Sequence, residues 1–106
     1  MMKRKVCVVV ASRANYGRIK SAMTAIAEQN NLELQVVVSA SALLDRFGRA
    51  IDVIQKDGFE VSAKVYVVLE GETPTTMAKT TGLAIIELAT ILENLKPDVV
   101  VSVADR

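Results

Sequence analysis

Four short segments rich in valine and other β-branched residues alternate along the chain with longer segments of helical periodicity. This alternation is typical of βαβ units, in which a helix connects two parallel strands of one sheet. The first valine run is nearly continuous, as expected of a strand that is covered on both faces. We predict strands at residues 5–10, 32–39, 59–69 and 98–103.

Three helices are predicted between these strands. Apolar residues recur at helical spacing in 18–29 and, more briefly, in 51–58. Thr73 and Pro74 offer an N-cap and a first helical residue for a long helix that stops at 96–97. Right-handed crossovers then give the strand order 3-2-1-4 with helices on both faces. The predicted fold is therefore an α/β, Rossmann-like parallel sheet. Core positions on the long helix are predicted at Met77, Ile85, Leu88, Ile91, Leu92 and Leu95.

With 106 residues, the chain is long enough for one hydrophobic core and too short for two. We predict a single domain over residues 1–106. Its fourth strand would leave an apolar edge uncovered, and natural proteins protect such edges. We therefore expect a lobe that is incomplete at its C-terminal end and belongs to a longer protein.

Charge and cysteine content exclude several functional classes. The formal net charge of +1 gives no field that would favour nucleic acid or an anionic membrane as a partner. Six of the 13 basic residues precede the first acid, Glu28, so this end of the chain could attract an anion or simply be solvated. Cys7 is the single cysteine, which rules out a disulfide within the chain. We expect a buried thiol and a cytoplasmic protein.

Metal and dinucleotide sites are also disfavoured. The chain has no histidine, and its cysteine and acids are not clustered at the spacing of metal ligands. The loop after the first strand has neither a G-x-G-x-x-G nor a P-loop pattern. We predict no metal and no cofactor.

Ligands of such sheets bind at the carboxyl ends of the strands, which selects residues 11–17, 39–48 and 104–106. A helix follows the first of these segments, and its N-terminus would present N–H groups to an anion. Arg13 would add a forked donor to a phosphate. The alternative is that Ser12 or Asn15 caps the helix while Arg13 is solvated.

Asp105 and Arg106 directly follow the last apolar strand, so both lie at the same rim. A carboxylate at this place could act as an acid, a base or a hydroxyl ligand. The alternative is that the two side chains pair with each other or solvate the strand end.

Five short motifs follow one another along the chain. They are Val-Val-Val-Ala-Ser-Arg-Ala-Asn-Tyr-Gly at 8–17, Asp-Gly-Phe at 57–59, Glu-Gly-Glu-Thr-Pro at 70–74, Met-Ala-Lys at 77–79 with Gly82, and Lys-Pro-Asp at 96–98 with Ala-Asp-Arg at 104–106. In this order they resemble the hydrolysing UDP-N-acetylglucosamine 2-epimerases of sialic-acid and nonulosonic-acid synthesis, over nearly the whole chain. The chain departs from that family at Asn15, where an acid is common. It also departs at Ala11, Ala42 and Ala104, where glycine, histidine and glycine are common.

The resemblance implies the N-terminal half of a two-lobed, GT-B-like fold with a UDP-sugar bound between the lobes. It also implies a reaction in which the sugar loses its C2 proton and UDP, and water then adds to the glycal intermediate. The product is the C2-epimeric free amino sugar. Asp105 matches the need for a carboxylate that moves a proton. Substrate-binding roles are implied for Ser12, Arg13, Asn15, Tyr16 and Arg106.

The resemblance further implies that the full-length parent is a homo-oligomer and that residues 1–106 alone are inactive. Three alternatives stay open on the sequence. They are a non-hydrolysing 2-epimerase, a GT-B glycosyltransferase and a non-catalytic, flavodoxin-like nucleotide-binding module.

Overall fold

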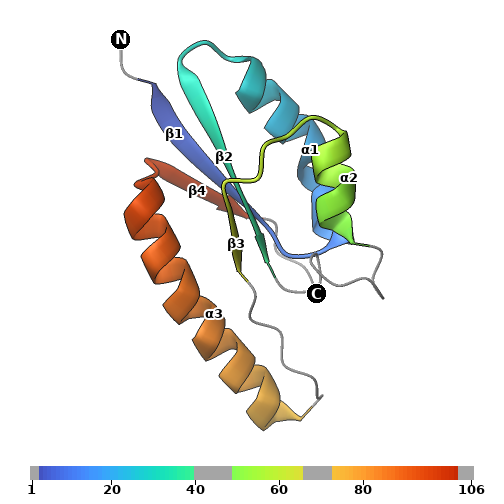
Figure 1. The fold of residues 1–106 in the computed structure, drawn as a ribbon, viewed down its shortest axis with the longest axis vertical. Coiled ribbons are helices and arrows are strands. Elements are labelled where there is room, and N and C mark those ends of the chain that lie inside the picture. The colour runs from blue at the N-terminus through green and yellow to red at the C-terminus, as the bar shows by residue number, and fades with distance from the viewer. Residues whose placement is uncertain (1–2, 40–48, 66–72, 103–106) are drawn as a thin grey trace.

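The computed structural model describes residues 3–39, 49–65 and 73–102. Within these ranges, every strand pair is parallel and the sheet has the order β3-β2-β1-β4 (Figure 1). The predicted strand order and the predicted alternation with helices are confirmed. The elements are β1 (Arg4–Val10), α1 (Arg13–Glu28), β2 (Leu32–Ser39), α2 (Ala50–Lys56), β3 (Ala63–Val65), α3 (Pro74–Leu95) and β4 (Val99–Ser102).

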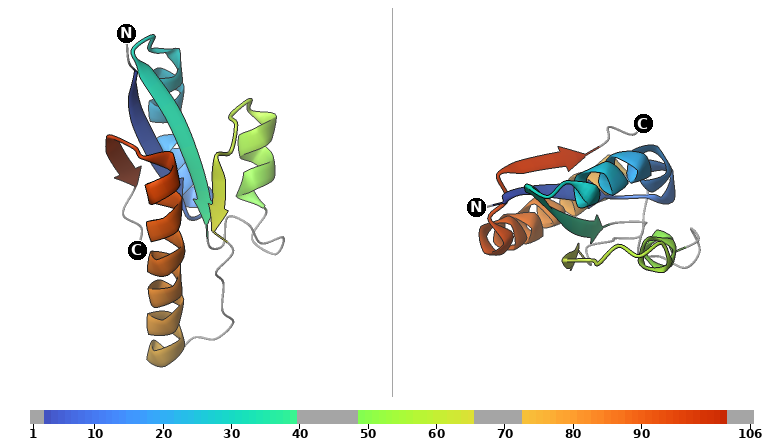
Figure 2. Two further views of the ribbon diagram at one scale, coloured as in Figure 1. Left: turned by 60° about the vertical axis from the view of Figure 1, so that its left-hand side comes forward. Right: turned by 90° about the horizontal axis from the view of Figure 1, so that it is seen from above.

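Helices cover both faces of the sheet, as predicted. On one face, α1 and α2 pack through Ile19, Met23, Ile51 and Ile54, all at most 8% exposed. On the other face, the C-terminal half of α3 packs against the sheet (Figure 2). None of the described helices meets the length and hydropathy that a bilayer crossing requires.

The valine run of β1 is explained by this double cover. Val8 and Val10 point into the core under α1 and α2, and Cys7 points into the core under α3. Successive side chains of a strand alternate between faces, so a strand that is covered on both has no polar side. The predicted burial of Cys7 is confirmed, and desolvation raises the pKa of its thiol.

The first helix begins earlier than predicted, at Arg13 rather than 18. The polar residues after β1 suggested a loop, but Ser12 has an extended backbone and its side chain accepts the N–H of Asn15. This cap supplies a partner for one of the donors that every helix N-terminus leaves unpaired. The prediction of a loop over 11–17 was therefore wrong from residue 13 onward.

The segment after α2 is strand only at Ala63–Val65, not from 59 as predicted. α2 ends in a Schellman motif, in which Gly58 at φ 96° donates to Gln55 O and Phe59 donates to Ile54 O. Phe59 then packs against the core under α1 and α2 before the chain joins the sheet. Residues 66–69 lie outside the described ranges.

The long helix was predicted correctly at both ends. Thr73 caps it, Pro74 is its first residue, and Lys96 ends it in the left-handed conformation. Its predicted core stripe is right for Leu88, Ile91, Leu92 and Leu95, which pack on the sheet. It is wrong for Ile85, which is 62% exposed, because the N-terminal half of α3 extends past the ends of the strands (Figure 2). The side chain of Met77 lies outside what the structure describes.

Candidate functional site

The carboxyl ends of the strands form one edge of the sheet, and α1 and α2 both begin there (Figure 1). The chain crosses from one side of β1 to the other between β3 and β4, so the end of β1 is the topological switch point. Open α/β sheets bind their ligands in the crevice beside such a point. The first turn of α1 is therefore the part of the described structure where a site is expected.

Hydrogen bonds fix this first turn. Ser12 Oγ accepts the N–H of Asn15 at 3.1 Å, and Asn15 Oδ1 reaches back to accept the N–H of Ala11 at 3.3 Å. The arrangement resembles a capping box that has been extended by one residue. The capping roles foreseen for Ser12 and Asn15 are thus present, and they hold the loop between β1 and α1 in one conformation.

Asn15 also carries a buried donor without a partner. The residue is 4% exposed, and its Nδ2 has no hydrogen-bond acceptor among the described residues. A buried polar group of this kind costs free energy unless a water or another group pairs with it. The Ala11 bond to Oδ1 fixes the orientation of the amide, so the unpaired group is the N–H₂ at the start of α1.

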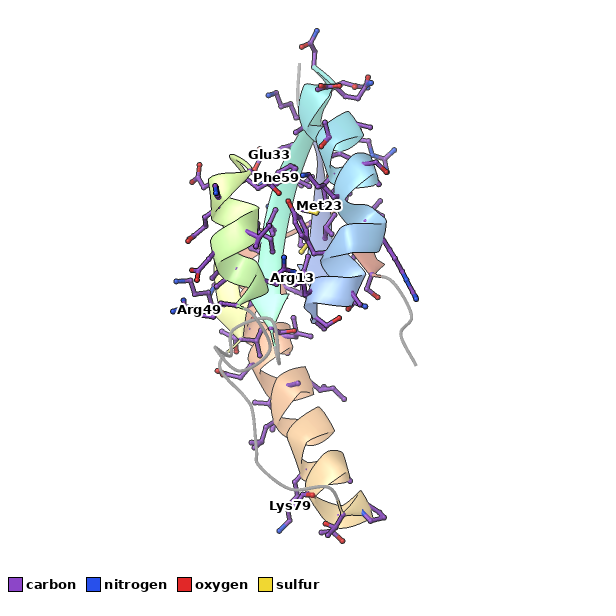
Figure 3. The ribbon with its side chains drawn as sticks, turned by 90° about the vertical axis from the view of Figure 1, so that its right-hand side faces the viewer. Arg13, Met23, Glu33, Arg49, Phe59 and Lys79 are labelled. Atoms are coloured by element: carbon purple, nitrogen blue, oxygen red, sulfur yellow. The ribbon has the colours of Figure 1, made fainter. Side chains whose placement is uncertain are left out.

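Arg13 is the first residue of α1 and is exposed. In Figure 3 its side chain lies between the ribbons of α1 and α2. A guanidinium there adds a full charge to the partial positive charge of the helix N-terminus. Both act in the same direction and favour an anion at this edge.

Tyr16 lies deeper, between α1 and the turn after α2. It is 3% exposed, its hydroxyl donates to Asp57 Oδ2 at 2.5 Å, and its ring meets Phe59 edge-on at 6.4 Å between centroids. Lys20 Nζ lies 3.1 Å from the same carboxylate oxygen. These contacts tie α1 to the end of α2 and so hold the first turn of α1 in place.

The electrostatics of this cluster follow from its contacts. The hydrogen bond from Tyr16, together with Lys20, holds the pKa of the Asp57 carboxyl below its usual range. Burial, and then the bond to ionised Asp57, raises the pKa of the Tyr16 hydroxyl well above its usual value. Both groups therefore keep their ordinary charge states at neutral pH, and neither is tuned for proton transfer.

The remaining predicted site residues, Asp105 and Arg106, lie outside the described ranges, as does segment 40–48. Of the five proposed substrate-binding residues, the structure brings Ser12, Arg13, Asn15 and Tyr16 together on the first turn of α1. Among the described residues, no group of three His, Cys, Asp or Glu side chains could hold a metal ion.

Sequence reasoning missed Arg49, which precedes α2. Its side chain is half exposed and its Nε lies 3.5 Å from Asp52 Oδ2 (Figure 3). It brings a second guanidinium to the edge where Arg13 lies. No local sequence pattern predicts this, because residues 13 and 49 reach the same edge of the sheet only through the fold of the intervening chain.

An α/β lobe with this strand order and a capped helix at its switch point has the architecture of the doubly wound parallel folds. The model of the UDP-N-acetylglucosamine 2-epimerase family matches residues 24–106. The chain belongs to this family. The family assignment implied by the five sequence motifs is confirmed.

Individual relatives agree with the family. Over 106 residues the chain is 31% identical to the GDP/UDP-N,N'-diacetylbacillosamine 2-epimerase (hydrolyzing) of Campylobacter jejuni, covering all of this chain and 27% of that protein. It is 27% identical to the UDP-N,N'-diacetylbacillosamine 2-epimerase (hydrolyzing) of Legionella pneumophila, covering 99% of this chain and 28% of that protein. The chain thus spans little more than a quarter of the length of these relatives.

Solved structures show the same fold. A UDP-N-acetylglucosamine 2-epimerase superposes with a TM-score of 0.76 at 19% identity, over 92% of this chain and 26% of that one. The UDP-GlcNAc 2-epimerase of Neisseria meningitidis, solved bound to UDP-GlcNAc, superposes with a TM-score of 0.66 at 20% identity, over 91% of this chain and 24% of that one. The predicted Rossmann-like half of a two-lobed, GT-B-like fold is confirmed.

Proposed function

We propose that residues 1–106 form the N-terminal lobe of a hydrolysing UDP-N-acetylglucosamine 2-epimerase that works in the cytoplasm. The substrate is UDP-GlcNAc or a UDP-linked diacetamido analogue, and the products are UDP and the C2-epimeric free amino sugar. Family membership supports the 2-epimerase activity. The hydrolysing outcome is supported by the names of the relatives that are 31% and 27% identical.

The observation that carries the proposal is the first turn of α1. Ser12 and Asn15 hold it in a fixed conformation at the switch point, and Arg13 adds a cation there. Elimination of UDP leaves negative charge on the diphosphate as the bond from the sugar C1 to oxygen breaks. Pre-oriented N–H groups and a guanidinium stabilise such charge without reorganising during the reaction.

The five binding residues have different parts in this proposal. Arg13 and Arg106 bind the diphosphate side of the substrate, and Ser12 and Asn15 contribute hydroxyl and amide groups. The buried Nδ2 of Asn15 is the donor that still lacks an acceptor among the described residues. Tyr16 stays a predicted substrate contact, although its hydroxyl is engaged by Asp57 and would have to exchange that bond.

Asp105 is proposed as a proton-transferring carboxylate of the catalytic set. Removal of the C2 proton needs a base, and delivery of a proton to C2 on the opposite face inverts the configuration there. Further acids of the set are expected outside residues 1–106, so this lobe alone is proposed to be inactive.

The test is product analysis with an enzyme that carries this lobe. UDP-GlcNAc and its diacetamido analogue are each supplied, and ³¹P and ¹H NMR follow the products. The proposal predicts free UDP together with a free C2-epimeric sugar. A UDP-linked epimer would show a non-hydrolysing enzyme instead, and transfer of the sugar to an added acceptor would show a glycosyltransferase.

A further inference from the structure

Two buried side-chain atoms of the described residues have no hydrogen-bond partner. They are Nδ2 of Asn15, which is a donor, and Oε1 of Gln35, which is an acceptor. Both residues are nearly as buried as the core, at 4% and 5% exposure. Because almost all buried polar groups in folded proteins are paired, each of these atoms needs a water or another polar group beside it.

The unpaired acceptor of Gln35 lies inside the lobe. Gln35 is on β2 in register with Cys7 of β1, in the layer that α3 covers. Its Nε2 donates to the carbonyl oxygen of Leu95 at 3.0 Å, at the C-terminal end of α3. Since the helix closes this layer, a single water is a sufficient partner for Oε1.

The unpaired donor of Asn15 lies at the edge of the sheet where ligands are expected. Asn15 Oδ1 accepts the N–H of Ala11, the residue that directly follows β1, at 3.3 Å. This bond places the amide over the carboxyl end of β1, at the switch point of the sheet. Nδ2 is the other branch of the same amide, so it is held at the switch point without an acceptor among the described residues.

The groups beside this amide on the first turn of α1 are mainly donors as well. The N–H of Ala14 belongs to that turn and so has no acceptor within the helix. Arg13 contributes a guanidinium, which can only donate. The acceptor capacity of Ser12 Oγ is used in part by the N–H of Asn15. A ligand group that brings its own proton would meet donors here, whereas an unprotonated oxygen would be stabilised by them.

We propose, resting on the function proposed above, that Asn15 is a specificity-determining residue of the substrate site. Its Nδ2 donates to a non-bridging oxygen of the diphosphate, and the site accepts at this point only an oxygen that carries no proton. The amide suits this place because it serves two partners, accepting from Ala11 and donating to the ligand. A carboxylate has the same shape and could still accept from Ala11, but it would repel the diphosphate.

The first experiment compares two substitutions at this position in the whole enzyme, with the Kd for UDP measured by calorimetry. Asn15→Asp keeps the acceptor for Ala11 but replaces the donor by a negative charge, so it should weaken UDP binding about 100-fold or more. Asn15→Ala removes donor and acceptor without adding a charge and should weaken binding about 10-fold. Asn30→Asp makes the same chemical change at an exposed position beyond the other end of α1 and should bind UDP as the wild type does.

The order of the two variants separates a ligand donor from a residue that only supports the turn. If Asn15 acted only through its bond to Ala11, Asn15→Asp would bind UDP like the wild type, and Asn15→Ala would be the weaker binder. A donor to the diphosphate gives the opposite order. Circular dichroism without ligand should show that both variants keep the fold.

A series of ligands locates the contact and does not depend on the folding of Asn15→Asp. The loss of affinity in Asn15→Ala should appear for UDP and for inorganic pyrophosphate but not for uridine, which has no phosphate. Wild-type affinity for UDP in Asn15→Asp would overturn the inference and leave only a buried water at Nδ2, and so would an equal loss for uridine.

The failure of this inference can be told from the failure of the proposed function. If Arg13→Ala weakens UDP binding and free UDP is among the products, the proposed function stands even where the variants of Asn15 overturn its role. If Arg13→Ala also binds UDP like the wild type, both the role of Asn15 and the diphosphate site at the first turn of α1 are wrong.

Discussion

Two helices of this lobe start with the same capping chemistry in different surroundings. Ser12 caps α1 at the end of β1, beside the buried Asn15 and Tyr16. Thr73 caps α3 in solvent, where Thr73 and Thr76 each accept the other's N–H at 3.1 Å. Both ends are well formed, and the first is held in addition by the hydrogen bond from Tyr16 to Asp57. A helix N-terminus becomes a candidate binding site where a strand end and packed side chains fix it, and capping alone does not suffice.

The largest expected difference concerns catalysis at the strand ends. General acid or base catalysis is worth about 10²- to 10⁴-fold, so Asp105→Asn in the whole enzyme should lower kcat by about that factor. Glu87→Gln, at an exposed carboxylate of α3, is the matched control and should leave kcat unchanged. Steady-state kinetics and thermal unfolding are measured together. Full turnover in Asp105→Asn, or loss of its fold, would remove the catalytic assignment.

The effect of lost packing on unfolding stability should differ almost as strongly between the buried face of α1 and the exposed face of α3. Met23 of α1 is fully buried, and Met23→Ala should lower the free energy of unfolding by about 2–5 kcal/mol. Leu83 of α3 is 42% exposed, and Leu83→Ala should cost under about 0.5 kcal/mol. Urea unfolding of both variants is measured at the same low protein concentration. Equal costs would mean that α3 is as well packed as α1 along its whole length.

The two caps offer a direct comparison. Ser12→Ala should destabilise the lobe by about 1–2 kcal/mol, and Thr73→Ala by about 0.5–1 kcal/mol, because an exposed helix end can exchange its partner for water. Ser12→Ala should also weaken UDP binding to the whole enzyme about 2- to 10-fold, since it loses a hydrogen-bonding group. Thr73→Ala should bind UDP like the wild type. UDP affinity is measured by calorimetry. If Thr73→Ala binds UDP more weakly than Ser12→Ala, the start of α1 is not the helix end that binds the ligand.

The contact of Asp57 with Tyr16, which anchors α1, should have a smaller effect on stability, and this effect should depend on pH. Because folding lowers the pKa of Asp57, its stabilising contribution is complete above the ordinary carboxyl pKa of about 3.9. The contribution is lost as the pH falls through the lower pKa of the folded state. The difference in Tm between wild type and Asp57→Asn should therefore be constant from about pH 5 to 8 and shrink below about pH 4. A difference that grows on acidification would show that the carboxylate does not anchor Tyr16.

The order of the elements could be predicted because their hydrophobic patterns are local. The valine run of β1 and the Thr73-Pro74 start of α3 carry their structure in adjacent residues. The start of α1 was missed because polar residues both form loops and cap helices, and the choice here depends on Ser12 and Asn15 bonding to the backbone. Ile85 of α3 was assigned to the core because periodicity does not reveal that a helix extends past its sheet.

The position of the candidate site in the fold could be predicted for the same reason, because most of its proposed residues are adjacent in the sequence. The sequence places four of its residues on one segment, and the fold confirms that this segment lies at the switch point. The bond from Tyr16 to Asp57 joins residues 41 positions apart, and no local pattern reports it. Arg49 reaches the same edge only through the fold of the intervening chain.

The central claim is that the first turn of α1 binds the diphosphate of a UDP-sugar. It is tested most directly by the Kd for UDP of the whole enzyme, measured by calorimetry for Arg13→Ala and for Arg18→Ala. Arg18 is the matched control, since it is an exposed arginine on the same helix but lies beyond the first turn. Loss of a charge-assisted hydrogen bond costs about 1.5–3 kcal/mol, so Arg13→Ala should weaken UDP binding about 10- to 150-fold. Arg18→Ala should bind as tightly as the wild type. Equal affinities in both variants and the wild type would contradict the claim, and the first turn of α1 would then be only a well-capped helix end.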